Sequence, residues 1–138
     1  MSGQPVHSYV ADTHTLHWLL FNSSLLSANA AAIKSAQSAV EPVFVSAISL
    51  VELRYLVEKG KIAESVYRGC LQALDDPATV LTAYPLDRIV ADNSHHIPRA
   101  TVPDMPDRII AATALTLGLP LITRDGNIRK LTNITTIW

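Results

Sequence analysis

Short apolar segments typical of buried β-strands alternate with helix-forming segments along the chain, and this alternation limits the possible folds more than any other feature. The expected strands cover residues 6–11, 43–46, 80–84, 119–123 and 134–138. The expected helices cover residues 15–21, 27–40, 49–59, 62–74, 86–94 and 106–117, with a loop at 95–103 and a short helical segment at 127–131. Strands joined by helices pair in parallel, because a helix returns the chain to the edge where it started. The pattern predicts an α/β sandwich around a mostly parallel sheet.

The chain of 138 residues is 49% hydrophobic, so we expect one domain over residues 1–138 with a sizeable core. Its longest apolar runs are far shorter than the roughly 20 residues that cross a bilayer, and residues 1–7 lack the features of a secretory signal. We therefore expect a cytoplasmic protein without a membrane segment. The single cysteine, Cys70, excludes a disulfide within the chain and is interpreted as a packed thiol.

Two acids follow expected strands directly. Asp12 comes after the first strand, and Asp125 comes shortly after the strand at 119–123. Ligands of parallel sheets gather beyond the carboxyl ends of the strands, so these acids are candidate site residues. Each also has a purely structural interpretation, because Asp12 can cap the helix that follows it and Asp125-Gly126 can form an ordinary turn.

Two further acids lie in helices. Glu52 is a candidate site residue, although the segment from Ser49 to Glu52 also fits a capping box, in which the glutamate bonds back to the serine backbone. Around Pro106 the chain carries Asp104 outside the helix and Asp107 in its first turn. We expect Asp107 to be the ligand, with Asp104 as a helix cap or an outer acid of the site.

Four converging carboxylates require a cation or protons. Two negative charges about 4 Å apart repel by roughly 4 kcal/mol at an effective dielectric near 20. Mg²⁺ and similar hard cations prefer oxygen ligands, and a bound cation can activate water for attack on a phosphate. Such a site requires no serine or cysteine nucleophile. The net charge of −1 does not by itself indicate a nucleic-acid binder, so the case depends on these local residues.

The order and spacing of four segments resemble the motif blocks of PIN-domain proteins, most closely bacterial VapC-type toxins. The segments are VADTH at 10–14, SAISLVEL at 46–53, DRIIAATA at 107–114 and LITRD at 121–125. The resemblance implies a three-layer α/β/α PIN-like domain and an endoribonuclease dependent on Mg²⁺ or Mn²⁺, acting as the toxin of a toxin–antitoxin pair. It implies that RNA phosphodiester bonds are cleaved by metal-activated water, at a catalytic and metal-binding set of Asp12, Glu52, Asp107 and Asp125.

Other residues near these acids are expected to support the site. Thr123 can orient a carboxylate or contact water at the metal, and Asp104 is the supporting acid named above. Arg108 and Arg124 flank two of the acids and are candidate RNA-binding residues, although salt bridges to those acids are an equal alternative.

Two apolar clusters suggest protein partners. The first helix carries more apolar side chains than one buried stripe needs, so we expect some of them to contact an antitoxin peptide: Leu16, Trp18, Leu19, Leu20 and Phe21. We also expect a homodimer, both from the resemblance and from apolar residues of the helices at 49–59 and 62–74, among them Leu50, Leu53, Leu56 and Val57.

Two other functions are weighed against the ribonuclease. A haloacid-dehalogenase-like phosphatase also places an aspartate at a strand end, but it needs a second aspartate two residues later, where this chain has His14. A catalytically inactive PIN-fold module that binds RNA or protein is the second alternative. The presence of all four acids argues against it.

Overall fold

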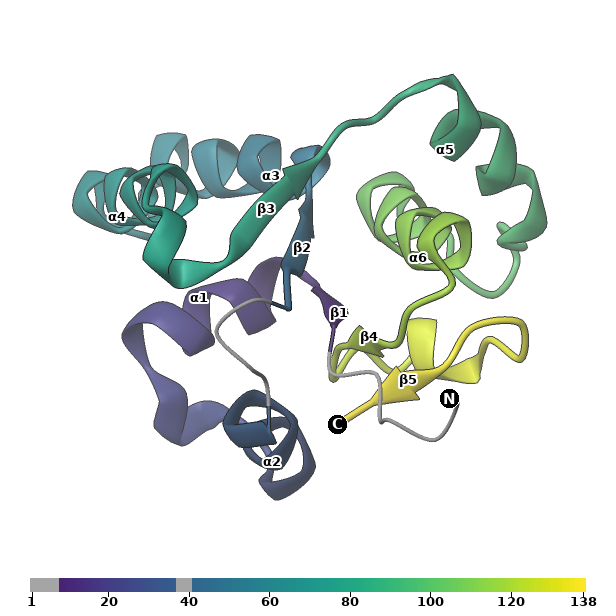
Figure 1. Cartoon of the computed structure of the whole chain (residues 1–138). Coiled ribbons are helices and arrows are strands. Elements are labelled where there is room, and N and C mark those ends of the chain that lie inside the picture. Colours follow the sequence, from purple (N-terminus) through teal and green to yellow (C-terminus); the bar gives the residue numbers. More distant parts are fainter. Residues whose placement is uncertain (1–7, 37–40) are drawn as a thin grey trace.

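A five-stranded parallel sheet forms the centre of the structure, a computed structural model that describes residues 8–36 and 41–138. The strands are β1 (Tyr9–Ala11), β2 (Val43–Ser46), β3 (Leu81–Tyr84), β4 (Leu121–Ile122) and β5 (Thr136–Ile137). They lie in the order β3-β2-β1-β4-β5 (Figure 1). All of the described pairings are parallel, so the mostly parallel sheet expected from the sequence is in fact entirely parallel in this part of the chain.

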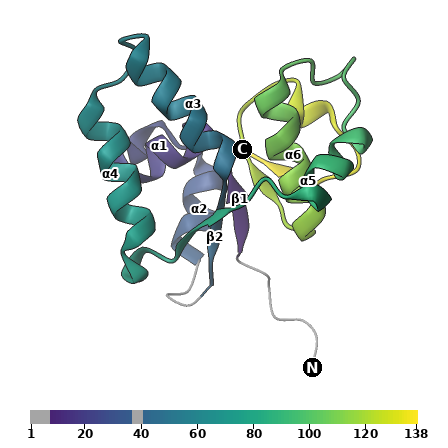
Figure 2. The ribbon, with the colours of Figure 1, turned by 90° about the horizontal axis from the view of Figure 1, so that it is seen from above.

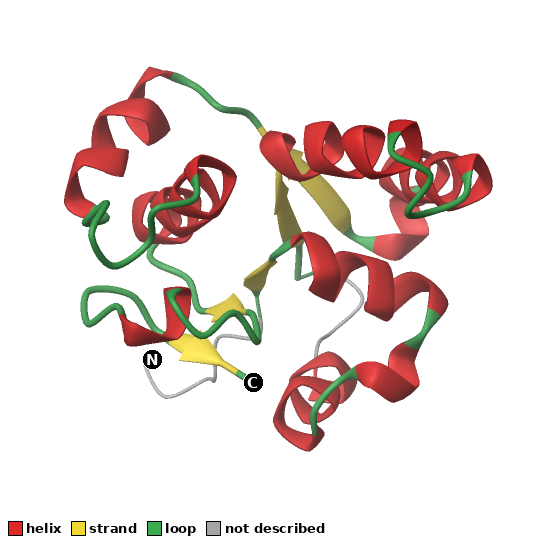
Figure 3. Ribbon diagram, turned by 180° about the vertical axis from the view of Figure 1, so that it is seen from behind, coloured by secondary structure: helices red, strands yellow, loops and turns green. Residues whose placement is uncertain are grey.

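Helices cover both faces of the sheet, which confirms the expected three-layer α/β/α fold (Figures 1 and 3). One face is covered by α5 (Arg88–Asn93) and α6 (Met105–Leu117). The other is covered by α1 (Thr13–Phe21), α2 (Ala28–Ala36), α3 (Ala47–Glu58) and α4 (Glu64–Asp75). Short 3-10 turns complete the described chain: η1 (Ser23–Leu25), η2 (Pro77–Thr79), η3 (Ser94–His96) and η4 (Ile128–Lys130).

The two-residue alternation of the strands divides the core between the layers. Val10 and Leu121 point into the cluster beneath α5 and α6, whereas Ala11 and Ile122 point into the cluster beneath α1 and α2. A third cluster joins α1, α3 and α4 and contains the buried Cys70. The interpretation of Cys70 as a packed thiol is therefore confirmed.

Several element boundaries differ from the sequence expectation. The helix expected at 27–40 ends at Ala36 within the described chain, and residues 37–40, like residues 6 and 7 of the first expected strand, lie outside the described residues. Val80 adopts a left-handed conformation with φ 52°, so the third strand begins one residue later. The expected strand 119–123 is shortened to Leu121 and Ile122, although the Pro120 carbonyl accepts a hydrogen bond from the Val10 N–H at 2.9 Å and the Thr123 N–H donates to the Ile137 carbonyl at 3.1 Å.

Helix starts bring the predicted site to the carboxyl edge of the sheet. Asp12 follows β1 and caps α1, Ser46 ends β2 and caps α3, and Thr123 follows β4. Seen from above, α3 and α6 lie on opposite sides of β1 (Figure 2). Within residues 8–36 and 41–138, no helix combines the length and the apolar character needed to cross a membrane.

Candidate metal centre

A cavity of about 600 Å³ lies at the carboxyl edge of the sheet, between the first turn of α1, one face of α3 and the start of α6. All four predicted site acids line it, together with Asp104. Apolar and aromatic side chains of α3 form a wall of the same cavity: Ile48, Val51, Tyr55 and Leu56. The fold thus gathers acids from four separate segments of the sequence into one place.

Asp12 is buried, with 7% of its surface exposed, and both of its carboxylate oxygens accept hydrogen bonds. The backbone N–H of Thr15 donates to Oδ1 at 2.8 Å, which is the helix-capping bond. The Thr123 hydroxyl donates to Oδ2 at 2.5 Å. The capping and site interpretations of Asp12 are therefore compatible, because one carboxylate caps α1 and also lines the cavity.

Asp125 likewise combines a turn with a place in the cavity wall. Its Oδ1 accepts hydrogen bonds from the backbone N–H groups of Asn127 and Ile128, both at 2.9 Å. Its own N–H donates to the Thr123 hydroxyl at 3.0 Å. Thr123 therefore connects Asp12 to Asp125, and its expected role of orienting a carboxylate agrees with this geometry.

Glu52 is held by α1 rather than by a capping box. The Thr13 hydroxyl donates to Glu52 Oε1 at 2.5 Å and lies 2.9 Å from the Ser49 hydroxyl. The residue that caps α3 is Ser46, three positions before Ser49, so Ser49 lies inside the helix and is buried. The capping-box interpretation is wrong because α3 starts directly after β2, earlier than the apolar pattern suggested.

Burial raises the pKa of the Glu52 carboxyl, and the negative charge of Asp104 raises this pKa further, against the lowering effect of the Thr13 hydrogen bond. A nearby cation would therefore favour the charged form of this glutamate.

The start of α6 presents two acids together. Asp104 is the N-cap, and its Oδ2 accepts a hydrogen bond from the Asp107 N–H at 3.1 Å, as the cap interpretation predicted. Asp104 also belongs to the site, because oxygens of Glu52, Asp104 and Asp107 lie within 4.8 Å of one another. Burial, and then the charges of Asp104 and three further acids, raise the pKa of Asp107 to about 7.

These properties fit a hard divalent cation. Carboxylate oxygens are the ligands that Mg²⁺ and Mn²⁺ prefer, and a nearby cation would offset the burial and the negative charges that raise the pKa of Asp107. Glu52, Asp104 and Asp107 are close enough to share one ion. Asp12 and Asp125 line the same cavity outside this group of three, and hydrogen bonds from Thr123, Thr15 and the η4 turn hold them.

The two candidate RNA-binding arginines occupy different surroundings. Arg108 donates from Nε to the Ile97 carbonyl at 3.0 Å and from an Nη to the Ser94 carbonyl at 2.8 Å, and it is not among the residues that line the cavity. It ties the loop before α6 to the helix. Arg124 does line the cavity, and its guanidinium carbon lies 4.7 Å from the centre of the Trp18 ring.

The apolar residues expected to meet partners are largely used inside the protein. In α1, Leu16 is completely buried and Trp18 is 7% exposed, whereas Phe21 is 47% exposed and its ring lies over Gly69 of α4. Leu53 is buried, and Leu50 packs against the same cluster. Leu16, Leu50 and Leu53 therefore do not form the spare surface that the sequence suggested, because they pack in the cluster that joins α1, α3 and α4. Phe21 remains exposed.

Sequence reasoning missed two hydroxyl residues of the site. Thr13 and Ser49 are both buried and join the start of α1 to α3. Thr13 follows Asp12 directly, and Ser49 lies three residues before Glu52 on the same helical face, which was the available signal.

These observations define the site as an acid-lined cavity at the carboxyl edge of the parallel sheet of an α/β/α fold. The chain belongs to the PIN domain family, whose model matches residues 9–134. A search of curated protein sequences finds no significant match.

Solved structures share the fold at low sequence identity. VapBC2 from Rickettsia felis, bound to a DNA fragment from its promoter, matches with a TM-score of 0.70 and 16% identity over 94% of this chain and 97% of that chain. VapBC-1 from nontypeable Haemophilus influenzae gives 0.70 and 15%, over 94% and 96%. VapBC-5 from Mycobacterium tuberculosis, a member of the VapBC family of toxin-antitoxin systems, gives 0.57 and 22%, over 96% and 98%.

Proposed function

We propose that this protein is a metal-dependent endoribonuclease that acts as the VapC-type toxin of a toxin–antitoxin pair. The observation that carries the proposal is the grouping of Glu52, Asp104 and Asp107 within 4.8 Å, in a cavity that Asp12 and Asp125 also line. Membership of the PIN domain family and the similarity in fold to VapBC structures support it.

The proposed metal is Mg²⁺ or Mn²⁺, held by Glu52 and Asp107, with Asp12, Asp104 and Asp125 completing the negative site. When bound, such a cation would neutralise charge on the phosphate. It would also lower the pKa of water, so that hydroxide would be available to attack the phosphate. The protein's own contribution is position: the Thr123 hydroxyl holds the Asp12 carboxylate, and the Thr13 hydroxyl holds Glu52. Prior orientation means that these acids need little rearrangement during reaction.

Attack by a cysteine nucleophile does not fit this chain. Cys70 lies in the core cluster that joins α1, α3 and α4, and burial raises the pKa of its thiol to about 11. A thiol with that pKa is protonated at neutral pH and is a poor nucleophile. Hydrolysis by water at the acids is therefore the reaction that the available groups support.

We include an antitoxin and a second copy of the chain among the proposed partners. The cavity combines acids with the exposed apolar side chains of Val51 and Tyr55, which are 61% and 58% exposed. An antitoxin segment with an apolar face and a basic side chain would complement both features. Light scattering at micromolar concentration tests the homodimer, since a species of only 15.0 kDa would contradict it.

The central experiment compares Asp107→Asn with the wild type. The substitution keeps the size of the side chain and removes its charge, so we expect folding to persist while Mn²⁺ affinity and RNA cleavage fall together. Cleavage by the wild type should stop in EDTA and return with Mg²⁺ or Mn²⁺. Cleavage that resists EDTA, or full activity in the variant, would refute the metal mechanism.

Asp87→Asn is the matched control. Asp87 caps α5 by accepting a hydrogen bond from the Val90 N–H at 2.9 Å, and it does not line the cavity. This variant should retain both metal binding and cleavage. If wild-type protein binds RNA with no cleavage under any metal condition, the alternative of an inactive PIN-fold binding module would replace the enzyme.

A further inference from the structure

We propose that Arg124, held against the ring of Trp18, binds a phosphate of the RNA backbone at the rim of the acid cavity. This inference rests on the proposed function and deepens it, because it names the residue that positions the substrate strand beside the metal-binding acids.

The geometry gives Arg124 a defined place. It is exposed and lines the cavity, and its guanidinium lies 4.7 Å from the Trp18 ring centre. Trp18 is itself fixed between neighbours: its ring lies 5.6 Å from Trp138 and stacks with His14 at 5.7 Å. The ring beneath the arginine is 7% exposed, so it forms a firm support for a side chain that would otherwise be free to move.

The charges around Arg124 leave its N–H groups available. Although Asp125 is its neighbour in sequence, Arg124 takes part in none of the ion pairs or hydrogen bonds found within residues 8–36 and 41–138. Arg108 and Arg54 differ, because Arg108 donates to two carbonyls and Arg54 to Glu64. A guanidinium held over an aromatic ring by its cationic charge can still use its planar N–H groups to bind phosphate oxygens in pairs.

The charged residues that line the cavity favour an RNA strand that would contact both Arg124 and a bound divalent cation. Of the described residues that line the cavity, Arg124 is the only lysine or arginine, and it stands at the rim of five acids. With a divalent ion held by the acids, the phosphates of an RNA strand would be attracted both to the acid site and to Arg124. His14, which is exposed and also lines the cavity, offers a ring on which a base can stack.

Tryptophan fluorescence provides a direct readout. The chain has two tryptophans, and both belong to this cluster, so any change in emission reports on it. Binding of a short single-stranded RNA is measured in an otherwise wild-type chain with Ca²⁺, which also binds carboxylate oxygens, in place of Mg²⁺. Gel analysis checks that the RNA stays intact during the titration. We expect RNA to change the emission, and Arg124→Gln to abolish that change and weaken affinity by about tenfold or more. Arg124→Lys should recover only part of the affinity.

Arg129→Gln is the matched control. Arg129 is exposed and lies one turn from Asp125, whose carbonyl accepts its N–H at 3.0 Å, but it does not line the cavity. This variant should change RNA affinity by less than about twofold, since scattered surface cations bind RNA weakly. Equal losses in both variants would show a diffuse basic surface and overturn the assignment, as would unchanged RNA affinity in Arg124→Gln.

Steady-state cleavage separates this inference from the proposed function. In an otherwise wild-type chain, Arg124→Gln should raise KM more than it lowers kcat. If the wild type cleaves RNA and Arg124→Gln keeps its KM, the inference alone fails. If the wild type does not cleave RNA at all, the proposed function fails, and the fluorescence titration still decides whether Arg124 binds RNA.

Discussion

The Thr123 hydroxyl joins two acids of the site with a single side chain. It is completely buried, donates to Asp12 Oδ2 at 2.5 Å and accepts from the Asp125 N–H at 3.0 Å. Because the hydroxyl both donates and accepts, its loss would leave a carboxylate oxygen and a backbone N–H without their partners. A buried polar group that loses its partner costs about 1–3 kcal/mol.

We therefore expect Thr123→Val, which keeps the shape of the side chain, to lower the free energy of unfolding by about 1–3 kcal/mol and to reduce cleavage strongly. Urea denaturation and an RNA cleavage assay measure the two effects. Thr123→Ser retains the hydroxyl and should recover most of the activity. A valine variant as active and as stable as the wild type would show that this link is unimportant.

The two ends of helix α6 have different roles. Residues at its start belong to the site, and the residue that ends it affects only stability. Its N-cap Asp104 and its first-turn residue Asp107 line the cavity, and the helix ends at Gly118, which adopts the left-handed conformation with φ 67°. A Cβ at Gly118 would meet no atom within 4 Å, so the conformation alone makes a larger residue costly there.

Gly118→Ala should thus lower the free energy of unfolding by about 1 kcal/mol while leaving the activity of each folded molecule unchanged. Asp104→Asn should instead weaken metal binding and leave the free energy of unfolding unchanged, since asparagine caps a helix as well as aspartate does but carries no charge for a cation. Thermal denaturation and Mn²⁺ titration of both variants test this division. Lost metal affinity in Gly118→Ala would contradict it.

The sequence predicted those parts of the fold and the site that depend on residues close together in the chain, and it did not predict contacts between distant residues. Asp12 and Asp125 were predictable because a strand end is visible in the local apolar pattern, and α6 because Pro106 and Gly118 mark its ends. The link from Thr13 to Glu52 joins residues 39 positions apart and required the packing of α1 against α3. The burial of Leu53 was not predictable for the same reason, since only the tertiary structure places it in the cluster that α1, α3 and α4 share.

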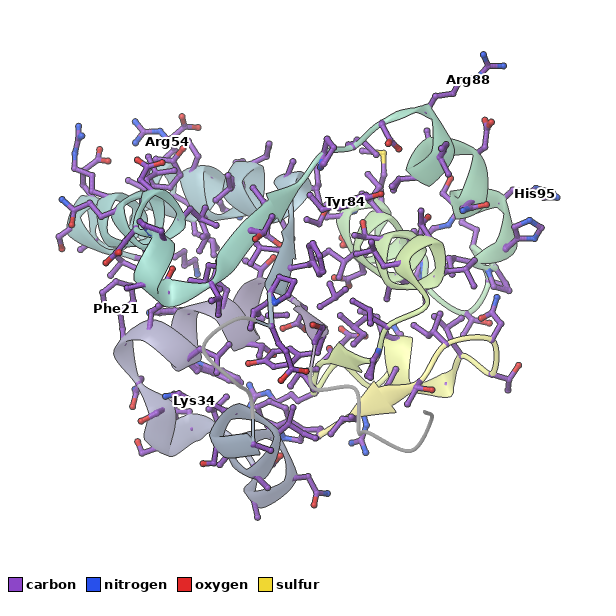
Figure 4. The ribbon with its side chains drawn as sticks, in the orientation of Figure 1. Phe21, Lys34, Arg54, Tyr84, Arg88 and His95 are labelled. Atoms are coloured by element: carbon purple, nitrogen blue, oxygen red, sulfur yellow. The ribbon has the colours of Figure 1, made fainter. Side chains whose placement is uncertain are left out.

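At the scale of the whole molecule, a net charge of −1 conceals a strong separation of charge. Five acids line one cavity, whereas Arg54, Arg88 and His95 point outward at the periphery (Figure 4). The fold therefore holds mutually repelling acids together, and the energy needed for this must come from the core. Without a cation, the stability of the protein should depend on pH through these acids.

The direction follows from the raised pKa of Asp107. Its unfolded value is 3.8 and its folded value about 7, so the folded state binds the proton more tightly. This favourable contribution is complete below pH 4 and is lost as pH rises through 7, on the order of a few kcal/mol. In EDTA, the melting temperature of the wild type should fall between pH 5 and 8 relative to Asp107→Asn.

Comparison with that variant at each pH cancels other titrating groups, such as His17, whose pKa is lowered by burial. Added Mg²⁺ should restore stability above pH 7 in the wild type and much less in the variant. A constant difference between the two melting temperatures across this range would show that the pKa of Asp107 is not raised in the folded protein.

The central claim is that these acids form a divalent-cation site. Crystals soaked in Mn²⁺ near pH 8, with data collected to reveal the anomalous signal of manganese, test it most directly. We expect a strong peak in contact with Glu52 and Asp107, next to Asp104, and its loss in crystals of Asp107→Asn. An acid cavity without a peak at millimolar Mn²⁺, or a peak only elsewhere on the protein, would show that these acids are not a divalent-cation site.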